Sequence, residues 1–500
     1  ALRCAIRLLS QLQLTTTLRS ALMNRKNVLR NTMGLLSLLL LLSPLGSAHG
    51  QQSNTLFLMH SVPQSSQLNP AVQPECRLFI GLPRINTLHF NYANSSFTYN
   101  DLTAGNTLSL DAVFNRLYRM NMISVEAAVS LFSVGYRHED NYFAFSVADR
   151  LDARLSFPRD LAGLLLYGNA NYIGNSLDIR NTRLNASYYR EYSASWSQKW
   201  DRFTTVGLRG KLLFGKANFH TGRSRVTLGT DVETFDLSMQ GGLVLNSSFP
   251  MELELNDAGM IDGVVVEEPD YRAILMNPRN VGLAFDAGVV YQYSDHLSFS
   301  ASLLDAGLIL WRDDVYNLSG EVDFSYSGVS DEADFSLAGY YRDISDSISE
   351  RVLYNITEQP YVSLLPVQLI LGGSYRWRKN VDLGLVLRNV PANRGSVSSL
   401  TALANMRIAE MFRASVSWSL LSNSFRNLGA GLAYTGMGVQ FYAVTDNILG
   451  FVQPLDSRTV NLRFGMNLML GCPQNYYRVR PPKRSMVPCP RGLTLGGRRR

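Results

Sequence analysis

Long stretches of this chain alternate apolar and polar side chains with a period of two, and this pattern constrains the fold more than any other feature. Between 184 and 197 one parity is polar, whereas the other is mainly apolar, with Leu184, Ala186, Tyr188, Tyr192, Ala194 and Trp196. The same division recurs at 281–292 and at 460–470. Successive side chains of a strand point to opposite faces, so each stretch predicts a strand with one apolar face. The stretches run for about 10 to 15 residues, whereas strands of soluble sheets mostly stop at five or six.

Such long strands, separated by turns, are typical of a transmembrane β-barrel, in which the apolar parity meets lipid and the polar parity lines the lumen. A sheet in lipid must close, because an open edge would leave backbone N–H and C=O groups unpaired in hydrocarbon. A secreted all-β sandwich or solenoid is the competing interpretation. Aromatic rings near strand ends favour the barrel, since barrels place such rings in interfacial girdles. These rings are Trp196, Trp200, Tyr291, Tyr293, Trp311, Tyr375, Trp377 and Trp418.

We therefore predict an all-β protein, an antiparallel transmembrane β-barrel of about 14 strands, because bacterial single-chain barrels have an even number. The candidate strands lie near 85–99, 123–137, 141–154, 183–198, 203–219, 224–232, 234–246, 281–294, 296–304, 308–326, 361–378, 381–389, 398–421, 427–446 and 457–471. Helical spacing is expected only at Leu108–Leu117 and Asp343–Tyr354.

The formal charge of +7 comes from the ends of the chain. Residues 1–50 hold six Lys or Arg and residues 473–500 hold eight, with no acid in either segment. The part between them, 51–472, carries 33 bases against 40 acids. No basic folded surface is left for nucleic acid, so nucleic acid is excluded as a partner.

The basic front end predicts a secretory signal peptide. Arg25, Lys26 and Arg30 precede an apolar run at 33–42, and Ala48-His49-Gly50 (48–50) fits a small-residue cleavage site. The run is shorter than the roughly 20 residues that a membrane-spanning helix needs. We expect an upstream extension at 1–22, the signal peptide at 23–50, an N-terminal hatch at 51–75, the barrel at 76–472 and a basic Pro/Arg-rich tail at 473–500.

Two segments resemble known membrane barrels. The turn Asn69-Pro70-Ala71, in an irregular Ser/Gln/Pro-rich segment, resembles the N-terminal hatch of the long-chain fatty-acid transporter superfamily. The segment NPRNVGLAFDAGVVYQYSDHLSFSASLLDAGLILWRDDVY (277–316) resembles a repeated block of an uncharacterised family (a domain of unknown function) of Gram-negative outer-membrane β-barrels. The resemblance implies a barrel in the cell outer membrane, reached by Sec-type export. It implies no particular substrate.

Small residues on the polar parity predict where the hatch docks. Glycine and serine allow another backbone to approach closely. The predicted strip is Gly282, Ala284, Asp286, Gly288, Ser298, Ser300 and Ser302. We expect the hatch to fold into the lumen against this strip, with Asp286 accepting hydrogen bonds from hatch N–H groups. The alternative is that the glycines only permit strand curvature. Near 303–305 the alternation slips by one residue, which predicts a bulge that turns Asp305 inward.

The cysteines allow several pairings. Cys76 precedes the first barrel strand and Cys472 ends the last, and these strands become neighbours when a barrel closes. A Cys76–Cys472 disulfide would join the seam in the oxidising periplasm. A Cys472–Cys489 disulfide and free thiols are the alternatives.

Enzymatic motifs are absent from the sequence, which predicts a protein that is not an enzyme and needs no cofactor. The six His show no zinc spacing, and no nucleophile elbow or phosphate-binding loop is present. The charged lumen positions Glu191, Arg209, Lys211, Asp286 and Arg463 are expected to pair with one another.

Two functions are compatible with this sequence. The first is a hatch-occluded transporter or channel for a small solute, with a hydrophobic solute as one candidate. The second is a structural or accessory barrel subunit of an outer-membrane secretion or assembly complex, with the acidic insert 331–358 as a docking surface for a protein partner. In both cases outer-membrane lipids surround the chain. Apolar side chains pointing into the lumen would favour transport, and a polar, tightly filled lumen would favour the accessory subunit.

Overall fold

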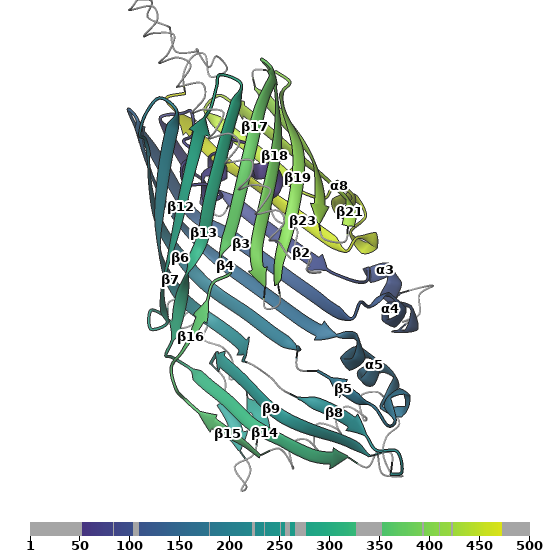
Figure 1. Cartoon of the computed structure of the whole chain (residues 1–500). Helices are drawn as coiled ribbons and strands as arrows, with labels where there is room; N and C mark the ends of the chain where they lie inside the picture. Colours follow the sequence, from purple (N-terminus) through teal and green to yellow (C-terminus); the bar gives the residue numbers. More distant parts are fainter. Residues whose placement is uncertain are drawn as a thin grey trace, which may run out of the picture.

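The chain forms an antiparallel sheet that closes into a barrel of fourteen strands (Figure 1). The computed structural model describes residues 53–472 except 84, 104–109, 180, 223–225, 235, 251, 256–260, 266–276, 327–352, 393–394, 410 and 422–423. The first barrel strand consists of two pieces, β1 (Leu78–Gly81) and β2 (Thr87–Asn94). Both pieces pair with β3 (Met120–His138) on one side and with β23 (Thr459–Leu470) on the other. This closure confirms the predicted fold class and strand number.

The remaining strands follow chain order around the barrel. They are β4 (Asn141–Pro158), β6 (Arg183–Lys199), β7 (Thr204–Thr221), β12 (Val281–Gln292), β13 (Leu297–Trp311), β17 (Gln368–Arg378), β18 (Val381–Ala392), β19 (Gly395–Arg407), β20 (Phe412–Leu421), β21 (Ser424–Gly436) and β22 (Val439–Thr445).

The period-two alternation of the sequence separates the two faces of the wall. In β12 the large side chains Leu283 and Phe285 are exposed on the outer face, whereas Ala284 and Asp286 are buried on the inner face. The other strands carry exposed Leu, Phe, Val and Trp side chains in the same way. The apolar outer face matches hydrocarbon, so the chain has the fold of an outer-membrane β-barrel.

The two rims of the barrel differ. At one rim, here called the short-turn rim, consecutive strands are joined by two to four residues, at 139–140, 200–203, 293–296, 379–380, 408–411 and 437–438. The opposite, long-loop rim carries α3 (Tyr99–Leu102), α4 (Leu110–Arg116), α5 (Arg159–Tyr167), α8 (Ile448–Val452) and the short 3-10 turns η3 (Ala170–Tyr172) and η4 (Pro454–Asp456).

The wall extends beyond the barrel at the long-loop rim, where it forms the lower lobe in Figure 1. The far end of β7 leaves β12 and pairs with β9 (Leu237–Ser248), which also pairs with β8 (Thr227–Thr230) and β14 (Val315–Tyr326). The further strands are β5 (Ser176–Asp178), β15 (Leu353–Thr357), β16 (Tyr361–Leu364) and a separate pair, β10 (Glu252–Leu255) and β11 (Ile261–Val265).

Several local expectations need correction. The stretch 398–421 is not one strand, because residues 408–411 form a turn between β19 and β20. Trp311 does not lie in an outer girdle: it is fully buried at the long-loop rim, where it stacks on Tyr361. The helix expected at 108–117 is present as α4, and the helix expected at 343–354 lies mainly outside the described residues, as does most of the insert 331–358.

Within the described ranges, no helix is both long and apolar enough to cross a membrane.

Candidate functional site

The N-terminal segment 53–76, called the hatch from here on, lies inside the lumen. It contains the short helix α2 (Asn54–Phe57) and the 3-10 helix η1 (Pro63–Gln67), and most of its residues are buried. The purple N-terminal part of Figure 1 is enclosed by the strands. At one end, Gln73 donates a hydrogen bond to the carbonyl of Asp140 in the short-turn rim (3.0 Å). From there the hatch extends inward.

Asp446 holds the other end of the hatch. Its carboxylate accepts hydrogen bonds from the backbone N–H of Thr55 (2.9 Å), the Thr55 hydroxyl (2.6 Å) and the backbone N–H of Asn54 (3.3 Å). The Thr55 hydroxyl also lies 2.6 Å from the hydroxyl of Ser417 in β20. These contacts satisfy donors at the start of α2, where a helix has no internal partner for its N–H groups.

Apolar hatch side chains pack against one side of the lumen wall. Leu56, Phe57, Leu58, Met59, Val62 and Leu68 form a buried cluster with wall residues that include Ile370, Val386 and Leu403. The wall leaves space for this cluster: a Cβ at Gly372 would lie 2.6 Å from the Phe57 ring, and one at Gly384 would lie 2.4 Å from Leu58. The hatch is therefore packed as a part of the protein core.

The turn Asn69-Pro70-Ala71 docks on the neighbouring strands β7 and β12. The Asn69 side-chain oxygen accepts from the N–H of Ala71 (3.0 Å) and so closes the turn. A Cβ at Gly207 would lie 2.3 Å from the Pro70 carbonyl, and one at Gly288 would lie 2.1 Å from the Asn69 side-chain oxygen. Only glycine lets the turn approach β7 and β12 this closely.

The predicted small-residue strip is only partly a docking surface. Gly288 contacts the hatch turn, Ser302 donates to the carbonyl of Leu68 (2.8 Å), and Ser300 lies close to Gly372 beside Phe57. The other members of the strip have different neighbours. Gly282 packs on Ile309, Ala284 belongs to a buried cluster with Ile309 and Trp311, and Ser298 bonds to Ser374.

The expected role of Asp286 was wrong. Its carboxylate accepts from Arg209 (3.1 Å), from Lys211 (2.9 Å) and from the backbone N–H of Asp305 (2.8 Å), not from hatch N–H groups. Asp286 lies directly opposite Arg209 in the β7–β12 register, so cations of the neighbouring strand occupy its oxygens. Arg209 in turn donates to the hatch carbonyls of Ser66 (2.5 Å) and Gln67 (3.0 Å), and thus Asp286 supports the hatch through Arg209.

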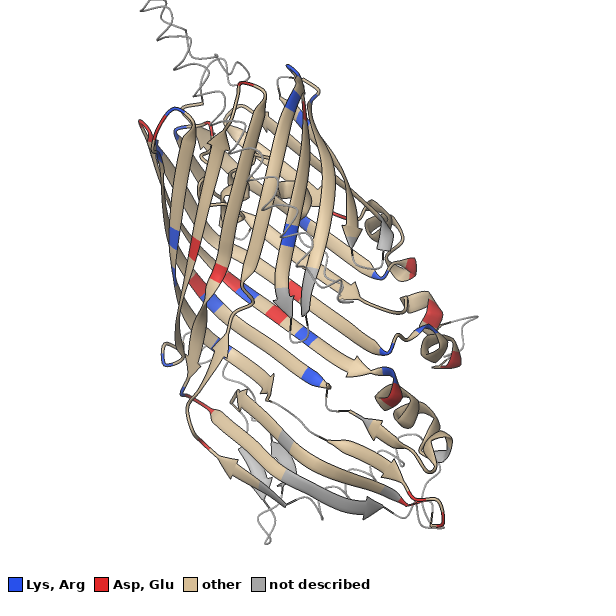
Figure 2. Cartoon of the chain, viewed as in Figure 1, with Lys and Arg blue, Asp and Glu red and all other residues tan. Residues whose placement is uncertain are grey.

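Charged residues of the strands form a band across the middle of the barrel (Figure 2). Lys211 lies 2.5 Å from Asp305, which reaches the lumen because the β12–β13 register shifts there and Asp305 takes a positive φ of 58°. Arg150 pairs with Glu191 (2.9 Å), and Arg154 pairs with Asp152 and Glu126. Mixed signs in contact argue against a lumen that selects strongly for one charge.

The hatch separates two cavities. The first, of about 110 Å³, is lined by hatch residues Ser53, Gln67 and Leu68 and by five Lys or Arg and four Asp or Glu of the wall. The second, of about 210 Å³, is lined by Leu58–Ser61, Glu75 and residues of the short turns, among them His296 and Asn380. Burial raises the pKa of the Glu75 carboxyl, although Arg413 lies 3.7 Å away and acts in the opposite direction. Both cavities are smaller than the roughly 300–1,000 Å³ of sites for drug-sized ligands.

The wall is interrupted next to the hatch. Between β1 and β2 the buried side chain of Asn86 donates to Ser130 and Ser133 (2.7 Å each) and accepts from Gln64 of the hatch (3.1 Å). Gln64 also exchanges two hydrogen bonds with Asn467 of β23 (2.7 and 3.0 Å). Hatch position and the local shape of the wall are therefore linked at this break.

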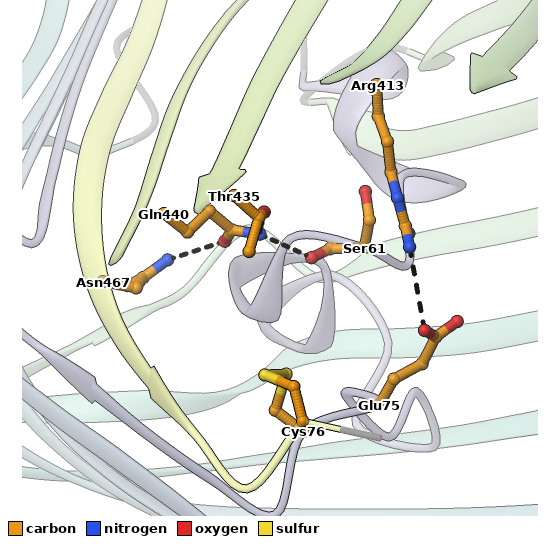
Figure 3. Close-up of a disulfide and its surroundings, with 8 residues drawn as sticks. Ser61, Glu75, Cys76, Arg413, Thr435, Gln440 and Asn467 are labelled. Atoms are coloured by element: carbon orange, nitrogen blue, oxygen red, sulfur yellow. Dashed lines mark hydrogen bonds and ion pairs between the residues drawn. A yellow bond between two sulfur atoms is a disulfide. The ribbon is translucent and has the colours of Figure 1, made fainter. Parts of the chain in front are cut away.

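Cys76 and Cys472 form a disulfide with an S–S distance of 2.09 Å where the hatch meets β1 (Figure 3). Nearby, Gln440 of β22 donates to the carbonyl of Ser61 in the hatch (2.9 Å) and accepts from Asn467 (3.1 Å). The disulfide thus joins the end of the hatch to the last barrel strand.

Across the described part of the chain, no three His, Cys, Asp or Glu side chains cluster in a way that could hold a metal ion. Sequence reasoning missed the polar hatch contacts of Asp446, Gln64, Asn86 and Gln440. Their only signal is a polar residue type, and many other polar residues of the lumen share this signal.

Three solved membrane barrels are similar to this chain. The Ralstonia pickettii toluene transporter TbuX is 10% identical, with a TM-score of 0.40 over 82% of this chain and 94% of that chain. A Pseudomonas aeruginosa FadL homologue is 10% identical, with a TM-score of 0.40 over 85% and 99%. The P. putida toluene transporter TodX is 10% identical, with a TM-score of 0.36 over 80% and 90%. No curated protein matches.

One family model matches residues 70–446, a span from the hatch turn to the Asp446 that anchors the hatch. The description of that family gives no function. This chain belongs to the family described as "Family of unknown function (DUF5723)".

Proposed function

We propose that this protein is an outer-membrane channel of a Gram-negative bacterium that its own N-terminal hatch keeps closed, and that it passes a small solute when the hatch moves. The observation that carries this proposal is the hatch itself, which stands in the lumen between two cavities. The short-turn rim is assigned to the periplasm and the long-loop rim to the outside, because bacterial barrels have short periplasmic turns and longer outer loops. No enzymatic activity is assigned.

The closed lumen offers a solute mainly charged groups. A hydrophobic solute would find apolar wall positions, such as Ile370, Val386 and Leu403, only after the hatch had moved, because hatch side chains cover them in the closed state. The charged first cavity, in contrast, is already formed. The geometry of the closed state therefore favours a polar solute over the hydrophobic one.

The accessory-subunit function remains the second candidate because of the density of polar contacts around the hatch. Gln64, Asn86 and Asn467 form a buried network, and Asp446 takes three hydrogen bonds. A hatch held in this way is compatible with a barrel that never opens. The experiment below separates the two functions.

A disulfide lock between hatch and wall tests the channel. The double variant Thr55→Cys/Ser417→Cys replaces two hydroxyls that lie 2.6 Å apart, so the thiols can bond with little movement. We expect proteoliposomes containing the oxidised variant to be impermeable to small solutes in a swelling assay, and the reduced variant to match wild type. The single variants Thr55→Cys and Ser417→Cys control for the substitutions, and reduced wild type controls for loss of the native disulfide.

Deletion of residues 53–68 tests the opposite effect, the opening of the channel. Removal of most of the hatch leaves Cys76 and the seam intact, and we expect swelling rates to rise well above wild type if the lumen behind the hatch is continuous. A folded deletion variant as impermeable as wild type, together with a lock that changes nothing, would reject the channel and favour the accessory subunit. Heat-modifiable gel mobility shows whether each variant has folded.

A further inference from the structure

Two buried arginines in the first cavity form no ion pair with a carboxylate of the described residues. Arg388 of β18 and Arg463 of β23 are 6% and 8% exposed, and both line this cavity. The Nε and Nη1 atoms of each guanidinium have no hydrogen-bond partner among the residues that the structure describes. Arg388 does donate from Nη2 to the side-chain oxygen of Gln368, which is a neutral group.

The other cations that line the first cavity are paired with carboxylates, which makes Arg388 and Arg463 exceptional there. Arg150 and Lys211 contact Glu191, Arg209 contacts Asp286, and Lys211 also contacts Asp305. In the described part of the chain, neither Arg388 nor Arg463 comes within ion-pair distance of a carboxylate. Buried charges are normally paired, because an unpaired ion loses its hydration without compensation.

Both guanidinium groups line the same cavity. Arg388 and Arg463 come from strands separated by β19, β20, β21 and β22, so they approach the cavity from different parts of the wall. His89, which lies directly opposite Arg463 in the β2–β23 register, lines the same space. A guanidinium presents a planar set of donors that fits carboxylate, phosphate or sulfate oxygens.

We propose that the first lumen cavity binds a small oxyanion between Arg388 and Arg463, with guanidinium N–H groups of both residues as donors. The volume of about 110 Å³ accommodates a small ion with a few water molecules and excludes a drug-sized ligand. The inference rests on the proposed channel in one respect, since it names small anions as one class of solute that the lumen would admit. The site itself requires only the closed barrel.

Calorimetric titration of the folded, detergent-solubilised protein with inorganic phosphate tests the site. We expect saturable binding of one phosphate per chain, competition by sulfate, and none by choline. Arg388→Gln and Arg463→Gln should each weaken binding by about 10-fold or more, the loss typical of a hydrogen bond to a charged group. Arg388→Lys should lie between wild type and Arg388→Gln, because it keeps the charge and loses the planar donors.

Arg376→Gln is the matched control. Arg376 is half-exposed, pairs with Asp382 (3.3 Å) and does not line the first cavity, so phosphate affinity should stay within about twofold of wild type. Absence of saturable binding to wild type up to about 10 mM phosphate would overturn the proposal. Equal weakening by Arg376→Gln would overturn it too, as would binding of a water-soluble lipid phosphate monoester without binding of inorganic phosphate.

Binding is measured on the closed protein and requires no transport. A protein that binds no phosphate would therefore not contradict the proposed channel. An impermeable hatch-deleted barrel would likewise not contradict the anion site.

Discussion

Substitution of Gly207 by alanine should displace the hatch turn without disturbing the barrel. The new methyl group would lie 2.3 Å from the carbonyl carbon and oxygen of Pro70 and 2.4 Å from the nitrogen of Ala71. All three are backbone atoms, so rotation of a side chain cannot relieve the overlap. Gly210, three residues along the same strand, has open space where its Cβ would lie, and Gly210→Ala is therefore the matched control.

The free-energy cost of docking the turn in Gly207→Ala follows from the geometry of this contact. Carbon atoms pack at about 3.5–4.0 Å, so the hatch turn must move by more than about 1 Å. Overpacking of this kind typically costs about 1–3 kcal/mol. Because 1.4 kcal/mol corresponds to a factor of ten, the undocked population of the turn should rise about 5- to 150-fold.

Hydrogen exchange followed by mass spectrometry measures this population. Peptides that cover 64–76 should lose protection in Gly207→Ala and keep wild-type protection in Gly210→Ala, while peptides from β3 and β4 stay unchanged in both. Wild-type protection of 64–76 in folded Gly207→Ala would refute the inference that close backbone contact docks the turn. Equal loss in both variants would show that any added methyl group on β7 is sufficient.

Three further perturbations test other contacts. Cys76→Ser should lower the free energy of unfolding by up to about 6 kcal/mol on the chain-entropy model for the 396-residue separation, and the folded band on a gel should be lost at a lower temperature. Cys472→Ser should have the same effect, and additive effects of the two substitutions would contradict the disulfide. Asp446→Ala should lower the free energy of local opening of residues 54–58, measured by hydrogen exchange, by about 2–4 kcal/mol, because two backbone donors lose their acceptor. Asp446→Asn should lower this free energy by less. Asp286→Ala should destabilise the barrel to denaturant by about 3–5 kcal/mol, since it leaves buried cations underpaired, and Asp286→Ala/Lys211→Met should recover part of the loss; no recovery would argue against the pairing.

The barrel was predictable because one physical constraint acts on every strand. Lipid requires an apolar outer face, so the alternation at 281–292 and 460–470 marks both the strands and their orientation. The turn at 408–411 was not visible, because apolar residues continue through it. The branching of β7 toward β9 was missed for a related reason: strand pairing beyond the barrel is determined by contacts between distant segments.

The interior was less predictable than the wall. A polar lumen residue can anchor the hatch, pair with a neighbour or line a cavity, so its residue type alone does not distinguish Asp286 from Asp446. A family resemblance did indicate the turn Asn69-Pro70-Ala71, which the Asn69 side chain closes locally. It could not show which glycine receives that turn, because this depends on the register between β7 and β12.

The covalent attachment of the hatch to β1, which the Cys76 disulfide also holds beside the end of β23, determines the kinetics that a moving hatch would have. Residues 53–76 can extend to at most about 80 Å from this attachment point, more than the roughly 30 Å hydrocarbon thickness of a bilayer, so the segment could leave the lumen and still be held at the rim. Its return would be intramolecular, at an effective concentration in the millimolar range set by the length of the tether. Closure would then be first order and independent of protein concentration, and each molecule would open and close on its own, without a diffusible blocker.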